Sequence, residues 1–219
     1  MRIDLHCHTL LSDGELLPIE LARRAVVKGH TAIAITDHAS LSNLDRLINE
    51  ARIDAELARE WNIEVLVGVE ITHVPVRRIY QVAAEARRKG AQIIVIHGET
   101  INEPVEKGTN LVAVSNPDVD ILAHPGFITM EEVELAKKND VVLEITSRRS
   151  HSSTNGHVAK LALQAGAKMV VNTDAHAPSD LIDYETAINV ALAAGLPRGD
   201  AVKAVKDTPL QMLKKVKGR

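Results

Sequence analysis

The sequence predicts an α/β fold in which parallel strands close into a barrel, and three observations support this prediction. Short apolar runs, rich in β-branched residues, alternate along the 219-residue chain with longer stretches of helical periodicity. The runs are apolar throughout, as expected of parallel strands that are covered on both faces. No glycine-rich dinucleotide-binding fingerprint follows the first run, which argues against an open doubly wound sheet.

Seven runs are expected to be strands, and their number favours a closed barrel. Repeated strand–helix units form eight-fold barrels of about 250 residues, close to the length of this chain. The runs are Arg2–His6, Ala32–Thr36, Glu64–Glu70, Gln92–His97, Ile121–His124, Val141–Thr146 and Met169–Thr173. No linker, charge block or low-complexity stretch separates them, so the sequence predicts a single domain over residues 1–219.

The segments between the strands carry signals for the start and end of helices. Pro18–Lys28 has proline in its first turn, and Gly29 follows its end. Thr129–Lys138 opens with the Thr-x-x-Glu spacing of a capping box. Further helices are expected at Asn43–Trp61, Val76–Lys89, Asn155–Ala165, Ser179–Ala194 and Asp200–Val216. Pro209 is expected to break the last of them, and residues 99–116 to form a short helix with loops.

Composition and charge exclude several classes of protein. Hydrophobic residues make up 45% of the chain and charged residues 25%, which is ordinary globular composition. No apolar run reaches the ~18 residues of a membrane span, and the N-terminus does not resemble a secretory leader. We therefore expect a cytoplasmic protein without a membrane partner. The net charge of −3 and the aromatic content of 2% disfavour binding to long nucleic acid.

Histidines and acids cluster where the predicted strands end. Because the C-terminal ends of barrel strands meet on one face, these side chains are expected to converge there. Nine residues are candidate metal ligands: His6, His8, Asp13, His38, Glu70, His97, His124, Asp174 and His176. Zinc and similar divalent ions accept imidazole nitrogen and carboxylate oxygen, and nine ligands suffice for two or three ions. Three other histidines are interpreted as structural: His30, His73 and His157.

The spacing of the first ligands fits an extended strand. His6 and His8 are two residues apart, so both rings project to the same side and can bind one ion. Asp174 and His176 repeat this spacing. Cys7 is the only cysteine, which excludes an intrachain disulfide and a cysteine-based zinc site. It is expected to point away from the two imidazoles and to pack in the core.

The order and spacing of these residues resemble the motifs of the PHP (polymerase and histidinol phosphatase) family. The matching motifs are His6-Cys-His8, Ser12-Asp13-Gly14, Thr36-Asp37-His38, Gly68-Val-Glu70, His97-Gly98, His124-Pro125 and Asp174-Ala-His176. The resemblance runs from residue 3 to about residue 178. It implies a distorted (β/α)7 barrel of the TIM type with a trinuclear metal centre.

The resemblance also implies how the ligands are shared among three ions. They would be bound by His6, His8, Glu70 and Asp174; by Glu70, His97 and His124; and by Asp13, His38 and His176. Some family members have histidine where this chain has Asp13, and an acid there would shift the preference toward manganese or iron, or weaken the third site. Zinc, manganese and iron all remain candidates. Asp37 is expected to orient a ligand imidazole.

The function implied is that of a metal-dependent phosphoesterase acting on a phosphate monoester of a small metabolite, such as histidinol phosphate. Two ions bridged by Glu70 would lower the pKa of a shared water, so no protein nucleophile is required. Asp13 or a water would protonate the leaving group. After the sixth strand, guanidinium and imidazole groups suit a phosphate, and the candidate substrate-binding residues are Arg148, Arg149 and His151.

Three alternatives follow from the same ligand set. The first is a nuclease or nucleotide phosphatase of the same family, acting on short oligonucleotides or on 3′,5′-bisphosphonucleotides. The second is hydrolysis of C–N bonds, as in related barrels, but no lysine stands at a predicted strand end to serve as a ligand. The third is a non-catalytic metal-binding domain, which the complete ligand set disfavours.

Overall fold

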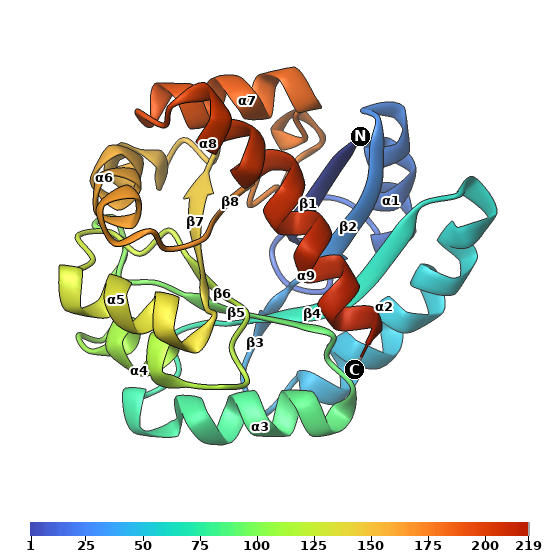
Figure 1. Cartoon of the computed structure of the whole chain (residues 1–219). Coiled ribbons are helices and arrows are strands. Elements are labelled where there is room, and N and C mark those ends of the chain that lie inside the picture. Colours follow the sequence, from blue (N-terminus) through green and yellow to red (C-terminus); the bar gives the residue numbers. More distant parts are fainter. Residues whose placement is uncertain (219) are drawn as a thin grey trace.

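The computed structural model describes residues 1–218 and shows a barrel of parallel strands surrounded by helices (Figure 1). The main strands are β1 (Arg2–Cys7), β2 (His30–Ile35), β4 (Glu64–Ile71), β5 (Ile93–His97), β6 (Ile121–Ala123), β7 (Val142–Thr146) and β8 (Met169–Asn172). They pair in the order β1-β2-β4-β5-β6-β7-β8, and every pair is parallel. A two-residue strand, β3 (His38–Ala39), pairs with the end of β4. The predicted seven-stranded α/β barrel is confirmed.

The barrel closes between β1 and β8 largely through side chains. A single backbone bridge pairs Cys7 with Ala175. At the start of β1, the buried guanidinium of Arg2 donates to the carbonyl oxygen of Val171 at 2.8 Å. The side-chain oxygen of Asn172 accepts a hydrogen bond of 3.0 Å from a backbone amide of β1. Buried polar side chains thus replace most of the ladder that neighbouring strands would form.

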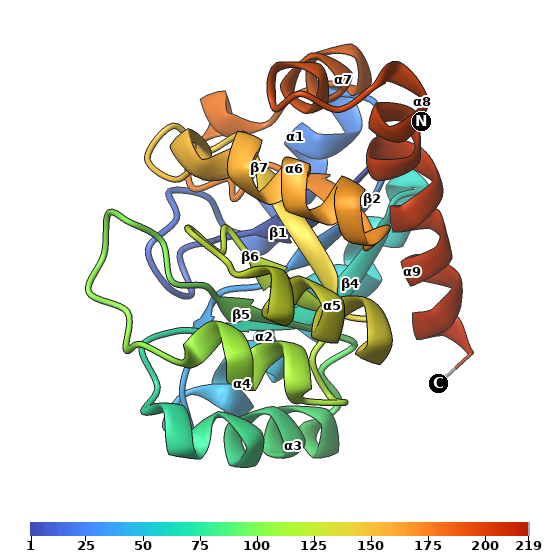
Figure 2. The same ribbon diagram turned by 60° about the vertical axis from the view of Figure 1, so that its left-hand side comes forward.

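Helices cover the outside of the barrel. They are α1 (Pro18–Val27), α2 (Leu44–Ala58), α3 (Ile79–Lys89), α4 (Thr109–Ser115), α5 (Met130–Asn139), α6 (Asn155–Ala165), α7 (Tyr184–Ala193), α8 (Arg198–Val202) and α9 (Thr208–Lys217). Figures 1 and 2 show α3, α4, α5 and α6 following one another around one side. Their apolar faces pack on the outward-facing strand residues and form the larger core cluster. None of the helices within residues 1–218 is both long and apolar enough to cross a bilayer.

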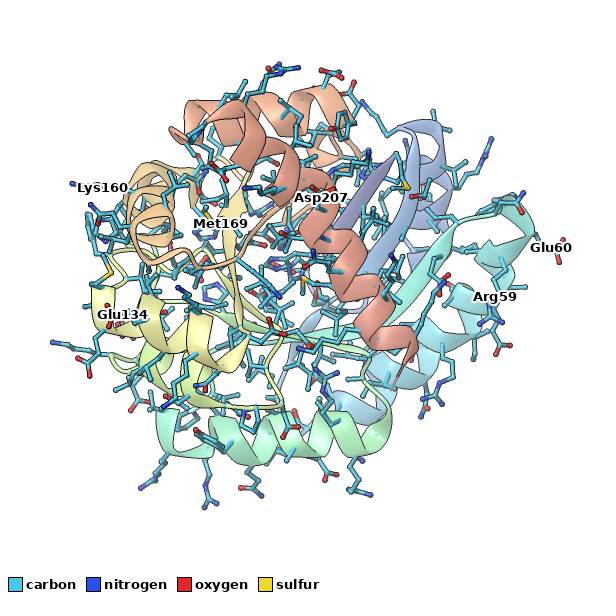
Figure 3. All side chains as sticks on the ribbon, in the orientation of Figure 1. Arg59, Glu60, Glu134, Lys160, Met169 and Asp207 are labelled. Carbon is cyan, nitrogen blue, oxygen red and sulfur yellow. The ribbon has the colours of Figure 1, made fainter. Side chains whose placement is uncertain are left out.

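Helix α9 covers one end of the barrel, and Figure 1 shows it lying across the strands. Met212 and Val216 of α9 pack against Ile3 and Val142, which lie near the starts of their strands. Figure 3 shows side chains filling the space inside the barrel, whereas the labelled Glu134 lies on the outer surface of the molecule, on α5. This apolar cover at the N-terminal ends leaves the opposite end of the barrel for polar groups.

The structure corrects two expected helix boundaries. The helix predicted from Ser179 begins at Tyr184, because Asp183 caps it through a hydrogen bond from the amide of Thr186 at 2.8 Å. Pro209 does not break the last helix, since it lies in the first turn of α9, where an amide hydrogen is not needed. A π-helical turn precedes it, and the chain stays helical from residue 198 to residue 217.

Candidate metal centre

The nine predicted ligands lie at the C-terminal end of the barrel, on strand ends and in the segments that follow them. Potential ligand atoms form overlapping groups in which all atoms lie within 4.8 Å of one another. Three of these groups consist only of predicted ligands. They are His8, Asp13, His38 and His176; His6, His124 and Asp174; and His6, His8 and Glu70. His97 joins His124 in a further group, whose third member is His151. Residues from six strand ends therefore meet in one place.

The first two candidate ligands lie on the inner side of β1. The register of β1 against β2 shifts between Asp4 and Cys7. Cys7 packs in the outer core, as predicted, while the Nε2 atoms of His6 and His8 lie 3.0 Å apart inside the barrel, as alternation along a strand requires. Both imidazoles are buried, which keeps their free nitrogen atoms away from bulk water.

The distances among four of these side chains match the edges of a coordination sphere. His6 Nε2 lies 3.4 Å from Glu70 Oε1 and 3.6 Å from Asp174 Oδ1. His8 Nε2 lies 3.5 Å from Glu70 Oε2 and 3.2 Å from Asp174 Oδ1. Bonds of about 2.1 Å to a tetrahedral ion would place its ligand atoms roughly 3.4 Å apart. The residues present therefore fit the ion that the resemblance assigns to them.

Asp13 is the centre of another group. Its Oδ1 lies 3.5 Å from His38 Nε2 and 3.2 Å from His176 Nε2, which are again edge lengths. Partial burial raises the pKa of the Asp13 carboxyl, but hydrogen bonds from His176 and His38 outweigh it and hold this pKa far below its usual range. A carboxylate so strongly held in the charged form suits a ligand better than a proton donor.

Glu70 is placed to bridge two ions. Its Oε1 lies 3.5 Å from His124 Nε2, as well as facing His6 on the other side. Within residues 1–218 this buried oxygen has no hydrogen-bond donor, which is costly unless a cation is bound there. Burial raises the pKa of Glu70, but His6, His97 and His38 outweigh it and hold this pKa well below its usual range. The ionised carboxylate that a bridging ligand requires is thus favoured.

Backbone strain is concentrated at the same strand ends. Within the described chain, five residues other than glycine have positive φ. Asn62 and Asp140 end helices in the left-handed conformation, where this is common. The other three are His73, His124 and Asp174, with φ of 51°, 27° and 51°. Such conformations persist where the surrounding structure holds them, and they cluster at functional sites.

Glu144 is a component of the site that sequence reasoning missed. This buried carboxylate on β7 accepts hydrogen bonds from His6 Nδ1 at 2.8 Å and Asn172 Nδ2 at 2.9 Å. Its other oxygen accepts one from the amide of His124 at 3.1 Å. A carboxylate behind a ligating imidazole fixes the ring so that the second nitrogen faces the ion. The available signal was an acid in the middle of an apolar strand.

Replacing Glu144 by glutamine is expected to weaken metal binding roughly 10–100-fold, the usual effect of removing the group behind a ligand. Glutamine has one oxygen that accepts hydrogen bonds and no negative charge, whereas both oxygens of Glu144 accept them. The ring of His6 is therefore held less firmly in its orientation. Zinc affinity measured by competition with a chromogenic chelator checks this. Glu134→Gln, on the outer surface of α5, is the matched control and should bind zinc like the wild type. Unchanged affinity in Glu144→Gln would contradict the role assigned to this residue.

The carboxylate of Asp37 binds to a turn of the backbone and not to an imidazole. Its carboxylate accepts hydrogen bonds from the amide and hydroxyl of Thr9, both at 2.7 Å, and from the hydroxyl of Ser12 at 2.6 Å. The expectation that Asp37 orients an imidazole is therefore wrong for this structure. It instead holds the turn that carries Asp13. Gly14 is required in the same turn, since a Cβ there would lie 2.6 Å from the carbonyl oxygen of His8.

The three candidate substrate residues occupy different places. Arg148 reaches the edge of the centre, where its Nε lies 3.7 Å from Asp174 Oδ2 and its Nη1 lies 3.5 Å from Asp180 Oδ2. Arg149 is exposed. Both arginines line a cleft of about 620 Å³ between the loops that follow β7 and β8 and the helix α7.

His151 is buried among the predicted ligands instead of lining this cleft. Its ring stacks on that of His124, with centroids 4.3 Å apart. Its Nδ1 is hydrogen-bonded to the hydroxyl of Thr100 at 2.8 Å. Burial and the neighbouring His124 lower the pKa of His151 to about 4, so its ring is neutral at pH 7.

Comparison with known proteins identifies the family. The family model of the PHP domain matches residues 4–177. An uncharacterized protein of Methanocaldococcus jannaschii is 52% identical over 218 residues, which cover 99% of this chain and 100% of that protein. A probable phosphatase of Thermoanaerobacter sp. is 29% identical over 212 residues, 89% of this chain and 86% of that one.

A solved structure of archaeal ribonuclease P with mature tRNA contains a chain of similar fold. The TM-score is 0.68 at 19% identity, and the match covers 98% of this chain and 89% of that chain. At this identity the likeness concerns the fold alone. The match of the family model over most of the chain, together with the barrel and its strand-end ligands, shows that the chain belongs to the PHP domain family.

Proposed function

We propose that this chain is a metal-dependent phosphoesterase that hydrolyses phosphate monoesters of a small metabolite, in the manner of a histidinol phosphatase. The observation that carries the proposal is the set of nine candidate ligands at one end of the barrel, eight of them at tetrahedral-edge distances from another member, with Arg148 at its margin. The similarity to a probable phosphatase of Thermoanaerobacter sp. over most of both chains supports it. Two or three divalent ions, of zinc, manganese or iron, are the cofactors implied.

The bound ions would supply Lewis acidity and a water of lowered pKa. The chain's own contribution is to orient and to bind. Glu144 and Asp37 hold His6 and the Asp13 turn in place, and the Arg148 guanidinium offers a planar fork to a phosphate oxygen. In this proposal Asp13 acts as a ligand, and a water protonates the leaving group.

The cleft beside Arg148 supports a small organic group as the rest of the substrate. Its walls combine hydroxyl groups with two aliphatic side chains, and they include Ser147, Ser150, Thr173, Ser179, Ile182 and Val190. A mixed lining of this kind suits a polar metabolite of modest size. Cytoplasmic location is part of the proposal, as a pool of small phosphorylated metabolites is found there.

The direct test is hydrolysis of p-nitrophenyl phosphate and of a library of phosphorylated metabolites by protein reconstituted with Mn²⁺ or Zn²⁺. Metal-stimulated release of phosphate is expected, with a preference for one class of monoester. The His6→Ala/His8→Ala variant should be inactive, since it lacks both imidazoles that face Glu70 and Asp174. If no phosphoester is hydrolysed at saturating metal, the proposal fails.

Arg148→Lys is expected to lower kcat/KM by roughly 10–100-fold, mainly through a higher KM, because an ammonium cannot replace the two-pronged contact of a guanidinium with phosphate. Steady-state kinetics on the preferred monoester check this. Arg149→Lys, on the exposed wall of the same cleft, should change kcat/KM less. Equal kinetics of Arg148→Lys and the wild type would remove Arg148 from the substrate site.

The second candidate function is cleavage of short oligonucleotides or of 3′,5′-bisphosphonucleotides by the same centre. The observation that favours it is the sequence similarity to a 5′-3′ exoribonuclease of Haemophilus influenzae, 42% identical over 71 residues that cover 32% of this chain and 23% of that protein. Release of mononucleotides from labelled oligonucleotides, or of phosphate from a 3′-phosphonucleotide, would distinguish it from the first candidate. A metal-binding domain without catalysis would bind two to three ions and turn over none of these substrates.

A further inference from the structure

Two side chains outside the nine predicted ligands join the centre at its mouth. Glu103 Oε2 lies 3.3 Å from His73 Nε2 and 3.2 Å from His97 Nε2. The three potential ligand atoms all lie within 4.8 Å of one another. These separations match the edge lengths found among the ligands deeper in the barrel.

Glu103 turns inward although it lies on a surface loop. The loop joins β5 to α4, and 38% of the Glu103 side chain is exposed. Its second oxygen, Oε1, lies 3.4 Å from His151 Nε2. The carboxylate thus faces three imidazoles, those of His73, His97 and His151.

The loop is anchored on both sides of Glu103. Before it, Glu99 Oε1 accepts hydrogen bonds from the amides of Gly108 and Asn110, at 2.8 and 2.9 Å. After it, Glu106 Oε2 accepts one from the amide of Val76 at 3.0 Å. These contacts hold the loop in a shape that delivers Glu103 to the barrel mouth.

His73 and His97 are also aimed at this point. His73 follows β4 and has the positive φ that it shares with His124 and Asp174, two predicted ligands. The Nδ1 atom of His97 contacts the carbonyl oxygen of Gly98 at 3.2 Å, which leaves Nε2 for a ligand. Among the ion pairs of residues 1–218, His97 pairs with Glu103 and not with Glu70.

The group is open to solvent. A cleft of about 330 Å³ is lined by His73 and Glu103 together with Asp13, His38 and Thr72. An ion could therefore enter and leave without opening the barrel.

We propose that His73, His97 and Glu103 bind a divalent cation at the mouth of the centre, in addition to the ions assigned to the other eight strand-end residues. The free Nε2 of His97 then binds this ion and not the ion shared by Glu70 and His124. Two imidazoles and one carboxylate are a ligand set that zinc accepts with a fourth position open to water. Because Glu103 comes from the β5–α4 loop, this ion would tie the loop to the strand ends. His73, interpreted from the sequence as structural, becomes a ligand.

Metal content tests the site without relying on catalysis. Full-length wild type, Glu103→Gln and His73→Gln are dialysed against buffered free Zn²⁺ and measured by mass spectrometry for bound metal per chain. Each variant should bind one ion fewer than the wild type, and the affinity for that ion should fall more than about 100-fold, beyond the usual effect of removing an outer group. Glutamine is close in size to both residues, and both side chains are substantially exposed, so folding is preserved.

Two controls isolate the site. Glu106→Gln removes the same charge from the same loop while keeping an oxygen to accept from Val76. His157→Gln removes a histidine that lies elsewhere, bonded to the carbonyl oxygen of Ile128. Both should keep the wild-type metal content.

Wild-type stoichiometry and affinity in either Glu103→Gln or His73→Gln would overturn the site. An equal loss in Glu106→Gln would assign the effect to the fold of the loop and would also overturn it. The outcome is separate from that of the proposed function. Wild-type protein that binds the additional zinc but hydrolyses no phosphoester would refute the proposed reaction and leave this site standing.

Discussion

Glu70→Gln is expected to lower phosphoesterase activity by at least about 1,000-fold, equivalent to roughly 4 kcal/mol of transition-state stabilisation, and to reduce bound metal. The reason is that the Glu70 carboxylate lies between the imidazoles assigned to two different ions. The two oxygens of Glu70 lie 3.4–3.5 Å from the Nε2 atoms of His6, His8 and His124, which belong to two predicted ions. A neutral amide of the same shape cannot supply the negative charge that both ions share.

The measurement is kcat/KM on p-nitrophenyl phosphate together with metal content per chain. Glu64→Gln is a matched control on the same strand, since Glu64 lies at the start of β4 and pairs with Lys217. It should retain full activity and metal. A Glu70→Gln protein with normal metal content and more than a tenth of the wild-type activity would show that Glu70 does not bridge ions.

Asp4→Ala is expected to lower the free energy of unfolding by about 3–5 kcal/mol, because it leaves the buried charge of Arg2 without its partner. The two side chains are fully buried and lie 3.0 Å apart. Burial raises the pKa of Asp4, but Arg2 and His30 outweigh it and lower the pKa to about 2. Asp4 Oδ1 also accepts from the amide of Thr173 at 3.2 Å, across the closure of the barrel.

Urea denaturation of metal-free protein at pH 7 measures this loss. Asp45→Ala, at an exposed ion pair with Lys89, should change stability by less than about 1 kcal/mol. The double variant Arg2→Met/Asp4→Leu should recover much of the loss, since an apolar pair replaces the buried charges. A loss below about 1 kcal/mol for Asp4→Ala would show that the pair does not hold the barrel closed.

The two predictions concern one connected set of buried polar groups. Arg2 and Asp4 join the first half of β1 to the end of β8 and the residue after it, and Asn172 adds a hydrogen bond from the amide of Leu5. Asn172 also donates to Glu144, which holds His6. The barrel seam and the metal centre therefore share hydrogen bonds, so a change at the seam should also disturb the orientation of a ligand.

Most of the barrel, and the meeting of the nine candidate ligands at one end of it, could be predicted from the sequence alone. The strands are buried on both faces, so each appears as an apolar run that ends at a polar residue. Parallel strands place those ends on one face, and local spacing then reveals candidates such as His6 and His8 or Asp174 and His176. Asp13 lies in a turn, where no periodic pattern marks it.

Other parts of the centre could be found only in three dimensions. Glu144 lies within a strand, and its link to His6 joins residues 138 positions apart. Glu103 lies in a loop without periodicity, and His151 was assigned to the substrate because it follows a strand near two arginines. Their roles depend on which side chains meet across the barrel, and local sequence patterns carry no information about contacts made by long-range packing.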